Sequence, residues 1–179
     1  MIKCKPYFVL RKEYNMKELE KFYRFERIER HKGFYNHDKN YKALSDINYI
    51  DFFPPLEDDE FPLDSAFWLL YGSCNHFALS LKNVLNYTPY IIENKNKSGF
   101  HAFCQVYKGG KQYYVDARGV TSCFDEFMEI ANDFVNGEFI IRPVTEDDIS
   151  EWEKGFDYND EAYMFSEAII KKYKSYYTI

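Results

Sequence analysis

The sequence predicts an α+β fold in which helices pack against an antiparallel sheet. Apolar residues recur at three- and four-residue spacing in several stretches, which is the pattern of amphipathic helices. In the second half, short runs rich in Tyr, Val and Ile flank a Gly-Gly pair, which is typical of a β-hairpin. The chain has 179 residues and 46% hydrophobic content, so we expect one domain, residues 1–179, with a sizeable core.

The N-terminal third is predicted to hold a short strand, residues 5–11, and a helix, residues 16–32. Asn15 gives this helix a start like a capping box, and its many charges are expected to form a solvated face. A long loop follows, residues 33–63, because this stretch is polar, aromatic and broken by prolines. Loops of that length inside a compact domain are often functional, and this one carries the acidic cluster 57–60.

Two helices are predicted on either side of Gly72. The first spans residues 66–71, and Gly72 ends it. The second spans residues 74–86, and Ser73 is expected to cap it by accepting from the free N–H groups that follow. The apolar stripe of this second helix is Phe77, Ala78, Leu81, Val84 and Leu85.

The second half is predicted to supply the sheet. The expected strands are residues 89–92, 100–107, 112–116 and 139–143, and the expected helices are residues 122–133, a short helix after Thr145 and a final amphipathic helix starting at Asn159 or Asp160. The helices at the N-terminal end and the helix that begins at Cys74 would therefore pack on an antiparallel sheet.

The composition argues against two classes of protein. The net charge is −6, and no basic run with interleaved aromatics occurs, so we expect no nucleic-acid partner. The longest apolar runs are far below the roughly 20 residues of a membrane-spanning helix, and the N-terminus lacks an apolar signal-peptide core. We therefore expect no membrane partner and a cytoplasmic location, or export by a signal not visible in the sequence. The oligomeric state is not specified.

The four cysteines are too few for a disulfide scaffold in a chain of this length. No Cys-x-x-Cys or His-x-x-x-His spacing occurs, so we expect no metal and no cofactor. Cys104 would lie on the sheet face opposite His101. Both Cys104 and Cys123 are expected to be structural, although the predicted helix start at Cys123 would activate that thiol too.

Cys74 stands out because it begins the second of these helices. The positive end of a helix lowers a thiol pKa from about 8.5 towards the neutral range and makes thiolate available. The same N–H groups are suited to hold a developing oxyanion. The alternative is a small buried hydrophobic residue, which is the commonest fate of a free cysteine.

The hairpin offers a base and a group that orients it. If Gly109-Gly110 is a two-residue turn with the flanking lysines paired, His101 lies opposite Arg118 and is a diagonal neighbour of Asp116 on one face. The carboxylate could then accept from one imidazole nitrogen and leave the other for a thiol. The alternatives are a strand histidine satisfied by a carbonyl and a solvated carboxylate, and a three-residue turn would separate the two side chains.

The other histidines are weaker candidates for the base. His76 is two residues from Cys74 on the same predicted helix, where the two side chains diverge. No readable geometry places a carboxylate beside His31 or His37. A nucleophile, a base and an orienting group in the order Cys, His, Asp is the set that nucleophilic catalysis requires.

Three motifs that occur in this order resemble a known group. They are Gly72-Ser-Cys-Asn-His-Phe-Ala-Leu-Ser-Leu, Phe100-His-Ala-Phe and Tyr113-Tyr-Val-Asp-Ala-Arg-Gly. They look like the core of the transglutaminase-like branch of the papain-like cysteine-enzyme superfamily. They are also similar to small uncharacterised bacterial proteins with an Asp-Ala-Arg-Gly signature. The resemblance covers residues 72–119.

The resemblance implies a papain-like, transglutaminase-like core and a Cys-His-Asp triad. Cys74 would be the nucleophile, His101 the base and then the acid, and Asp116 the group that orients the imidazole. The substrate would be a protein, a peptide or another amide, and the reaction would pass through a thioester. Peptidase, amidase, deamidase and transamidase activities all stay open.

Several residues are candidates for binding the substrate or its oxyanion. The oxyanion candidates upstream of the cysteine are Asn48, Trp68 and Tyr71, with a core role as the alternative for Trp68. Asn75 would donate to substrate from the first helical turn, or else lie on exposed helix surface. Arg118 would bind a carboxylate, hold Asp116, or form a surface salt bridge.

Two functions from other classes compete with this enzyme hypothesis. One is a protein-binding module that keeps the fold without catalysis. The other is a bacterial effector or toxin domain that acts on a protein of a host or a competitor.

Overall fold

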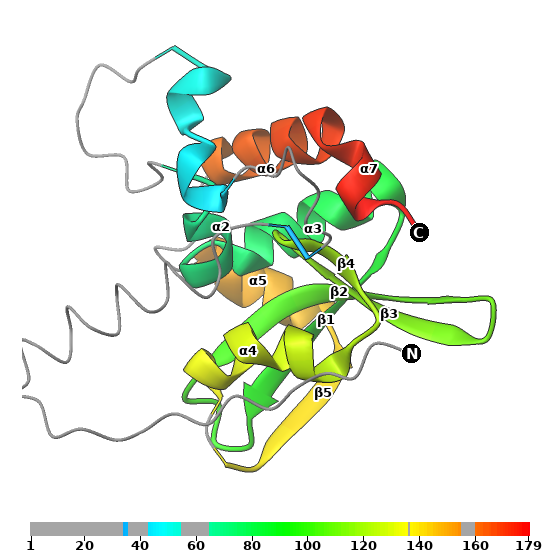
Figure 1. The fold of residues 1–179 in the computed structure, drawn as a ribbon. Coiled ribbons are helices and arrows are strands. Elements are labelled where there is room, and N and C mark those ends of the chain that lie inside the picture. The colour runs from blue at the N-terminus through cyan, green and yellow to red at the C-terminus, as the bar shows by residue number, and fades with distance from the viewer. Residues whose placement is uncertain (1–33, 36–42, 55–64, 136, 155–159) are drawn as a thin grey trace, which may run out of the picture.

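The computed structural model describes residues 34–35, 43–54, 65–135, 137–154 and 160–179. It confirms the α+β class: five antiparallel strands form one sheet with helices on both faces (Figure 1). The predicted strand 5–11, the predicted helix 16–32 and the acidic cluster 57–60 lie outside the described residues.

The order of elements follows the chain from short helices to a mixed second half. The helices are η1 (Leu44–Asp46) and η2 (Tyr49–Asp51), both 3-10, then α2 (Trp68–Tyr71), α3 (Cys74–Leu85), α4 (Phe124–Phe134), α5 (Glu146–Lys154), α6 (Asp160–Lys172) and α7 (Lys174–Tyr177). The strands are β1 (Thr88–Asn94), β2 (Phe100–Lys108), β3 (Lys111–Asp116), β4 (Gly119–Thr121) and β5 (Phe139–Pro143). Their order in the sheet is β4-β3-β2-β1-β5, so the hairpin that carries His101 and Asp116 is internal.

Most predicted boundaries in the described part hold within two residues. Helix α3 ends at the left-handed Asn86, which has a φ of 58°, and β5 has the predicted bounds. Helix α2 begins two residues later than expected, because Ser65 pairs with Asn48 in a β-bridge and keeps the chain extended there. The short elements β4 and α7 were not predicted.

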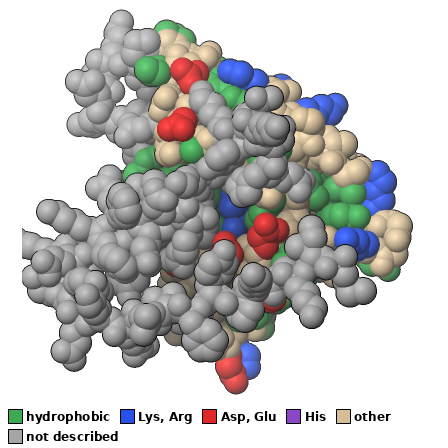
Figure 2. All heavy atoms as spheres, viewed as in Figure 1, with side chains coloured by type: hydrophobic (Ala, Val, Ile, Leu, Met, Phe, Trp, Pro, Cys, Tyr) green, Lys and Arg blue, Asp and Glu red, His purple; other side chains and the backbone are tan. Residues whose placement is uncertain are grey.

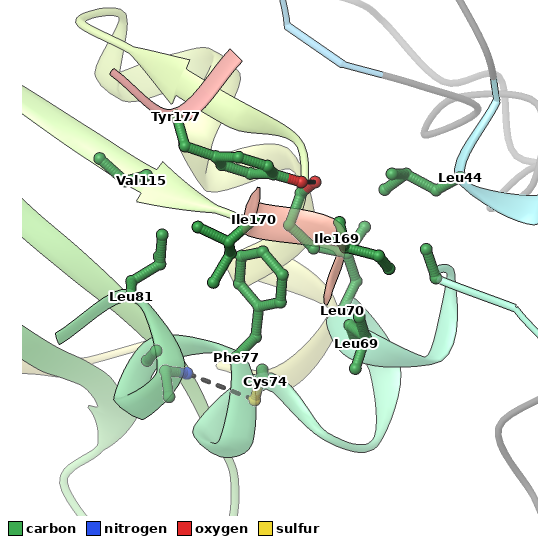
Figure 3. Packing of buried hydrophobic residues seen from close by; sticks show 14 of the residues in the cluster. Leu44, Leu69, Leu70, Cys74, Phe77, Leu81, Val115, Ile169, Ile170 and Tyr177 are labelled. Carbon is green, nitrogen blue, oxygen red and sulfur yellow. Dashed lines mark hydrogen bonds between the residues drawn. The ribbon is translucent and has the colours of Figure 1, made fainter. Parts of the chain in front are cut away.

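The sheet separates two hydrophobic clusters. On one face, Ile91, Ala102, Cys104 and Val115 pack in the same cluster as Phe77 of α3 (Figure 3). Helix α6 packs on α3, and α7 lies against β4 at the edge of the sheet (Figure 1). The second cluster lies on the opposite face, between the sheet and α4, and is made of Ile92, Phe103, Phe127, Met128, Ala131 and Val135. The helix with the cysteine and the helix α4 therefore approach the sheet from opposite sides.

The hairpin between β2 and β3 has the predicted turn. Lys108 pairs with Lys111, and both intervening glycines have positive φ (60° and 75°), as a two-residue hairpin turn of the mirror-image type requires. The ladder ends at the pair Cys104–Val115, so the predicted pairing of His101 with Arg118 is wrong. The reason is that β3 stops at Asp116, which pairs with Gly119 across the tight turn into β4.

No helix in the described ranges is long and apolar enough to span a membrane.

Candidate active site

Cys74 lies where β2 and β3 separate. It is the first residue of α3, and its side chain is buried at the edge of the hydrophobic cluster, near Phe77 (Figure 3). The backbone N–H of Ala102 donates to its Sγ at 3.4 Å, which is the dashed line in Figure 3. Ala102 lies beyond the last β2–β3 pair, so its N–H reaches the sulfur at a point where the hairpin ladder has already ended.

Ser73 is the N-cap residue of α3, but its side chain makes no capping hydrogen bond. The predicted hydroxyl cap is therefore wrong. A capping side chain needs an extended backbone, whereas Ser73 has a φ of −124° and a ψ of 31° because its N–H closes the preceding turn onto the Trp68 carbonyl at 3.0 Å. The start of α3 beside Cys74 keeps the positive potential of a helix N-terminus, with no neutralising acidic residue in the first turn.

His101 is completely buried, and its ring packs against α4. The imidazole lies parallel to the Phe134 ring, with centroids 5.9 Å apart, and 6.0 Å from the ring of Phe127. Its Nε2 is 3.5 Å from Oδ2 of Asp116. Neither ring nitrogen has a partner at normal hydrogen-bond geometry among the described residues, so this contact is a long one. Catalytic hydrogen bonds are often long in a free enzyme and tighten with substrate.

The surroundings of His101 favour the imidazolium form. Burial of the ring lowers its pKa, but the neighbouring Asp116 and Cys74 outweigh burial and raise the pKa to about 9. Both neighbours lie close enough for their charge to stabilise the imidazolium. The site therefore favours the imidazolium form of His101, with the Asp116 carboxylate 3.5 Å from its Nε2.

Asp116 is held in place by Arg118. The backbone N–H of Arg118 donates to Oδ1 at 2.9 Å, and its Nη2 donates to Oδ2 at 2.7 Å. Nε also lies 3.2 Å from Oδ1. Burial raises the pKa of Asp116, but Arg118 and then His101 outweigh it and hold this pKa well below its usual range. The carboxylate therefore stays ionised in the interior, so the solvated-carboxylate alternative is wrong.

The remaining donors of Arg118 are also used inside the protein. Nη1 donates to the carbonyl of Glu126 at 3.1 Å, and Nη2 to that of Phe127 at 3.0 Å, both on α4. Arg118 is buried, which excludes the surface salt bridge. The geometry therefore fits the prediction that Arg118 holds Asp116 in place. The turn between β3 and β4 directs the Arg118 side chain towards the interior, where it reaches the carboxylate.

The predicted substrate-contact residues lie in different environments. Asn75 is buried, and its Oδ1 is 2.9 Å from Nδ1 of His76, so the exposed-surface interpretation is wrong. Trp68 is 36% exposed, so the core interpretation is wrong for this residue. Its ring packs against Phe67. Trp68 therefore stays a candidate for contact with substrate, four residues before the helix break at Gly72.

The other two oxyanion candidates are engaged elsewhere. The hydroxyl of Tyr71 donates to Oδ2 of Asp133 at 2.7 Å, and the Asn48 side chain takes part in the capping box of η2 with Asp51. Both contacts leave the region of Cys74 without a side-chain oxyanion donor from these two residues. The backbone N–H groups at the start of α3 are the better candidates.

Cys104 and Cys123 lie in environments that do not favour a reactive thiolate. Cys104 is buried on the opposite sheet face from His101, and its Sγ donates to the Ala78 carbonyl at 3.3 Å. Burial raises the pKa of Cys104 far above its usual value, so this thiol is inert. Cys123 is the N-cap of α4 and is disulfide-bonded, so it offers no thiolate.

Tyr35 is a site residue that the sequence did not reveal. Its hydroxyl donates to Oδ2 of Asp116 at 3.1 Å, and its ring lies under the Arg118 guanidinium, 4.4 Å from the ring centroid. Its backbone N–H donates to the Arg118 carbonyl at 2.8 Å. Tyr35 falls in the predicted long loop, 81 residues before Asp116, and the aromatic content of that loop was the only signal.

Within the described ranges, no group of three or more His, Cys, Asp or Glu residues is arranged to hold a metal ion. On the face seen in Figure 2, the acidic and basic side chains of described residues are interspersed with apolar ones.

Comparison of the chain with protein-family models, with curated protein sequences and with solved structures gives no match. The function must therefore be argued from the geometry around Cys74.

Proposed function

We propose that the chain is a cysteine acyl-transfer enzyme of the transglutaminase-like kind, with Cys74 as nucleophile, His101 as acid and base, and Asp116 as the group that orients the imidazole. One observation carries the proposal: the buried imidazole of His101 lies 3.5 Å from the Asp116 carboxylate, while the N–H of the next residue, Ala102, donates to Sγ of Cys74. Three residues from three separate elements meet at the point where β2 and β3 diverge.

In the proposed reaction the proton of the Cys74 thiol already resides on His101 in the resting enzyme, so that a thiolate lies beside an imidazolium, and the thiolate attacks the carbonyl carbon of an amide. A C–S bond forms, and the carbonyl oxygen becomes an oxyanion that the N–H groups of the first turn of α3 would bind. The oxyanion collapses, the C–N bond breaks, and His101 gives its proton to the leaving amine. Water, or a second amine, then loses a proton to His101 and attacks the thioester carbonyl. The C–S bond breaks, the acyl product leaves, and the Cys74 thiolate and the His101 imidazolium are restored.

The environment of each residue supports its role. The N–H of Ala102 and the helix start stabilise negative charge on Sγ. Asp116, kept ionised by Arg118, stabilises the imidazolium and fixes the ring through Nε2. This leaves Nδ1 as the nitrogen for proton exchange with the thiol and the substrate.

A protein-binding module of the same fold is the second candidate, and burial favours it. His101 is 0% exposed and Cys74 is 7% exposed, so a substrate has little access to the reacting atoms in this conformation. An enzyme would have to admit the substrate at Sγ, whereas a binding module would not.

Acylation separates these two functions. The protein is mixed with p-nitrophenyl acetate, and acetyl groups on each cysteine are followed by peptide mass mapping. The enzyme proposal predicts that Cys74 is acetylated much faster than Cys104 and is then freed by hydrolysis, with both steps slowed in a His101→Ala variant. Equal acetylation of Cys74 and Cys104, with no dependence on His101, would contradict the proposal and favour the binding module.

A further inference from the structure

Asp116 is shared by more groups than a triad requires. Its Oδ2 accepts from Nη2 of Arg118 at 2.7 Å and from the Tyr35 hydroxyl at 3.1 Å, while Nε2 of His101 lies farther away, at 3.5 Å. Three groups therefore compete for one carboxylate oxygen, and two of them are closer than the imidazole.

Tyr35 is tied to this carboxylate by more than its hydroxyl. The cation–π contact and the backbone hydrogen bond to Arg118 fix the ring on the guanidinium. The preceding residue, Phe34, is buried and stacks on Tyr176 with centroids 4.1 Å apart, so the chain at Tyr35 is anchored to the C-terminal helices. The hydroxyl of Tyr35 is thus presented to Asp116 from a fixed position.

We propose that Tyr35 is a positioning residue of the site, which divides the negative charge of Asp116 between Arg118 and His101 by donating a hydrogen bond to Oδ2. A carboxylate that accepts an extra hydrogen bond offers less negative charge to its other partners. Since Arg118 alone makes hydrogen bonds to both carboxylate oxygens, loss of the Tyr35 hydroxyl leaves Asp116 in place and strengthens its pull on His101.

The protonation of Tyr35 fits this role. Burial raises its pKa, Arg118 lowers it, and Asp116 raises it again, with the result that the pKa lies well above the usual value. The hydroxyl therefore keeps its proton and remains a donor at neutral pH. The groups that act on His101 itself are Asp116 and Cys74, while α4 faces it with the apolar rings of Phe127 and Phe134.

The test is an NMR titration of the His101 imidazole in the full-length wild type and in a Tyr35→Phe variant, with the signal assigned by its loss in His101→Gln. Tyr35→Phe keeps the ring on Arg118 and removes only the donor, so the pKa of His101 should rise by on the order of half a unit. A Tyr87→Phe variant is the matched control, because that hydroxyl donates to the Tyr177 carbonyl and does not touch Asp116. The control should leave His101 unchanged.

A purely structural role for Tyr35 would lower the thermal midpoint and leave the pKa of His101 where it is, and that result would overturn the inference. A fall in this pKa would also overturn it, because it would show that Tyr35 holds Asp116 against His101 rather than competing with it. If Tyr35→Phe does not fold, 3-fluorotyrosine placed at position 35 strengthens the donor with little change of shape. The pKa of His101 should then fall, and an unchanged value would count against the inference.

The role of Tyr35 rests on the proposed function only because that function makes the protonation of His101 important. The role of Tyr35 and the enzyme proposal can therefore fail separately. A His101 titration that responds to Tyr35, together with a Cys74 acylation rate that ignores His101, would retain the inference and refute the enzyme. The opposite pair of results would retain the enzyme and refute the role of Tyr35.

Discussion

Replacing Asp116 with Asn removes the negative charge beside His101 while keeping the shape of the side chain. In the wild type, Asp116 and Cys74 overcome the opposing effect of burial and raise the pKa of His101 from 6.5 to about 9. Because Asp116 is one of only two groups that raise it, we expect the variant to lose at least about half of this rise. That corresponds to roughly 2 kcal/mol of lost preference for the imidazolium, at 1.36 kcal/mol for each pH unit.

The assay is an NMR titration of the His101 imidazole in wild type and Asp116→Asn. Asp148→Asn is the matched control, because that carboxylate is also held by an arginine, through hydrogen bonds of 2.7 and 2.8 Å to Arg142. A His101 pKa that is the same in wild type and Asp116→Asn would refute the assignment of Asp116 as its partner, whatever the control shows.

The variant must be folded for this comparison. Removing one partner of a buried ion pair typically costs about 3–5 kcal/mol, because the other charge is left uncompensated. Asp116 and Arg118 are both almost fully buried, so Asp116→Asn should lose stability in this range, as measured by urea unfolding. If it does not fold, the double variant Asp116→Asn with Arg118→Gln removes both charges and should recover much of the loss.

Three further predictions concern the ionisation of Asp116, the effect of Cys74 on His101, and the close approach of Gly99 to α4. The difference in unfolding free energy between wild type and Asp116→Asn should narrow as the pH falls below about 4. The folded state holds the Asp116 pKa below its unfolded value of about 3.9, so the stability contributed by the ionised carboxylate is lost as the pH falls from there. Urea unfolding between pH 7 and pH 2.5 measures the difference, and a constant difference would contradict the prediction. Cys74→Ala should lower the pKa of His101, since Cys74 raises it in the wild type, and the NMR titration checks this; an unchanged value would place the thiol out of reach of the ring. Gly99→Ala should lower the free energy of unfolding in urea by about 1–3 kcal/mol, because the new Cβ would lie 2.3 Å from the Phe134 carbonyl oxygen. Gly110→Ala is the control: it has open space around it and should lower the free energy of unfolding by only about 1 kcal/mol, through its positive φ. Equal losses in the two variants would refute the close contact at Gly99.

Local signals in the sequence were sufficient for the elements that carry the triad. The stripe behind Cys74 predicts α3, and the Gly-Gly pair predicts the turn and therefore the register of β2 on β3. The register decides which face of the sheet each side chain occupies. It therefore predicted that His101 and Asp116 lie on the same face, and the structure places them 3.5 Å apart.

The sequence did not predict where the β2–β3 ladder ends or which residue lies opposite His101. Spacing around the Gly-Gly turn does not show that the β2–β3 ladder ends at the pair Cys104–Val115, because the end is set by Asp116, which pairs with Gly119 of β4 instead. For the same reason the pairing of His101 with Arg118 was wrong, since the turn into β4 directs Arg118 towards α4 instead.

Tyr35 was missed because its contacts are entirely long-range. It lies outside any periodic segment, and its position follows from the packing of Phe34 on the C-terminal helices. Such a contact between a loop residue and a strand 81 residues later leaves no pattern that spacing can reveal.

The central claim is that His101 activates the thiol of Cys74, and the pH dependence of alkylation tests it most directly. Iodoacetamide labelling of each cysteine is followed by mass mapping in wild type, in His101→Ala and in His76→Gln, the last being a control at a buried histidine two residues from Cys74. We predict that Cys74 reacts faster than Cys104, and that only His101→Ala slows this reaction and changes its pH profile. Labelling of Cys74 no faster than Cys104, with the same pH profile in His101→Ala, would contradict the account.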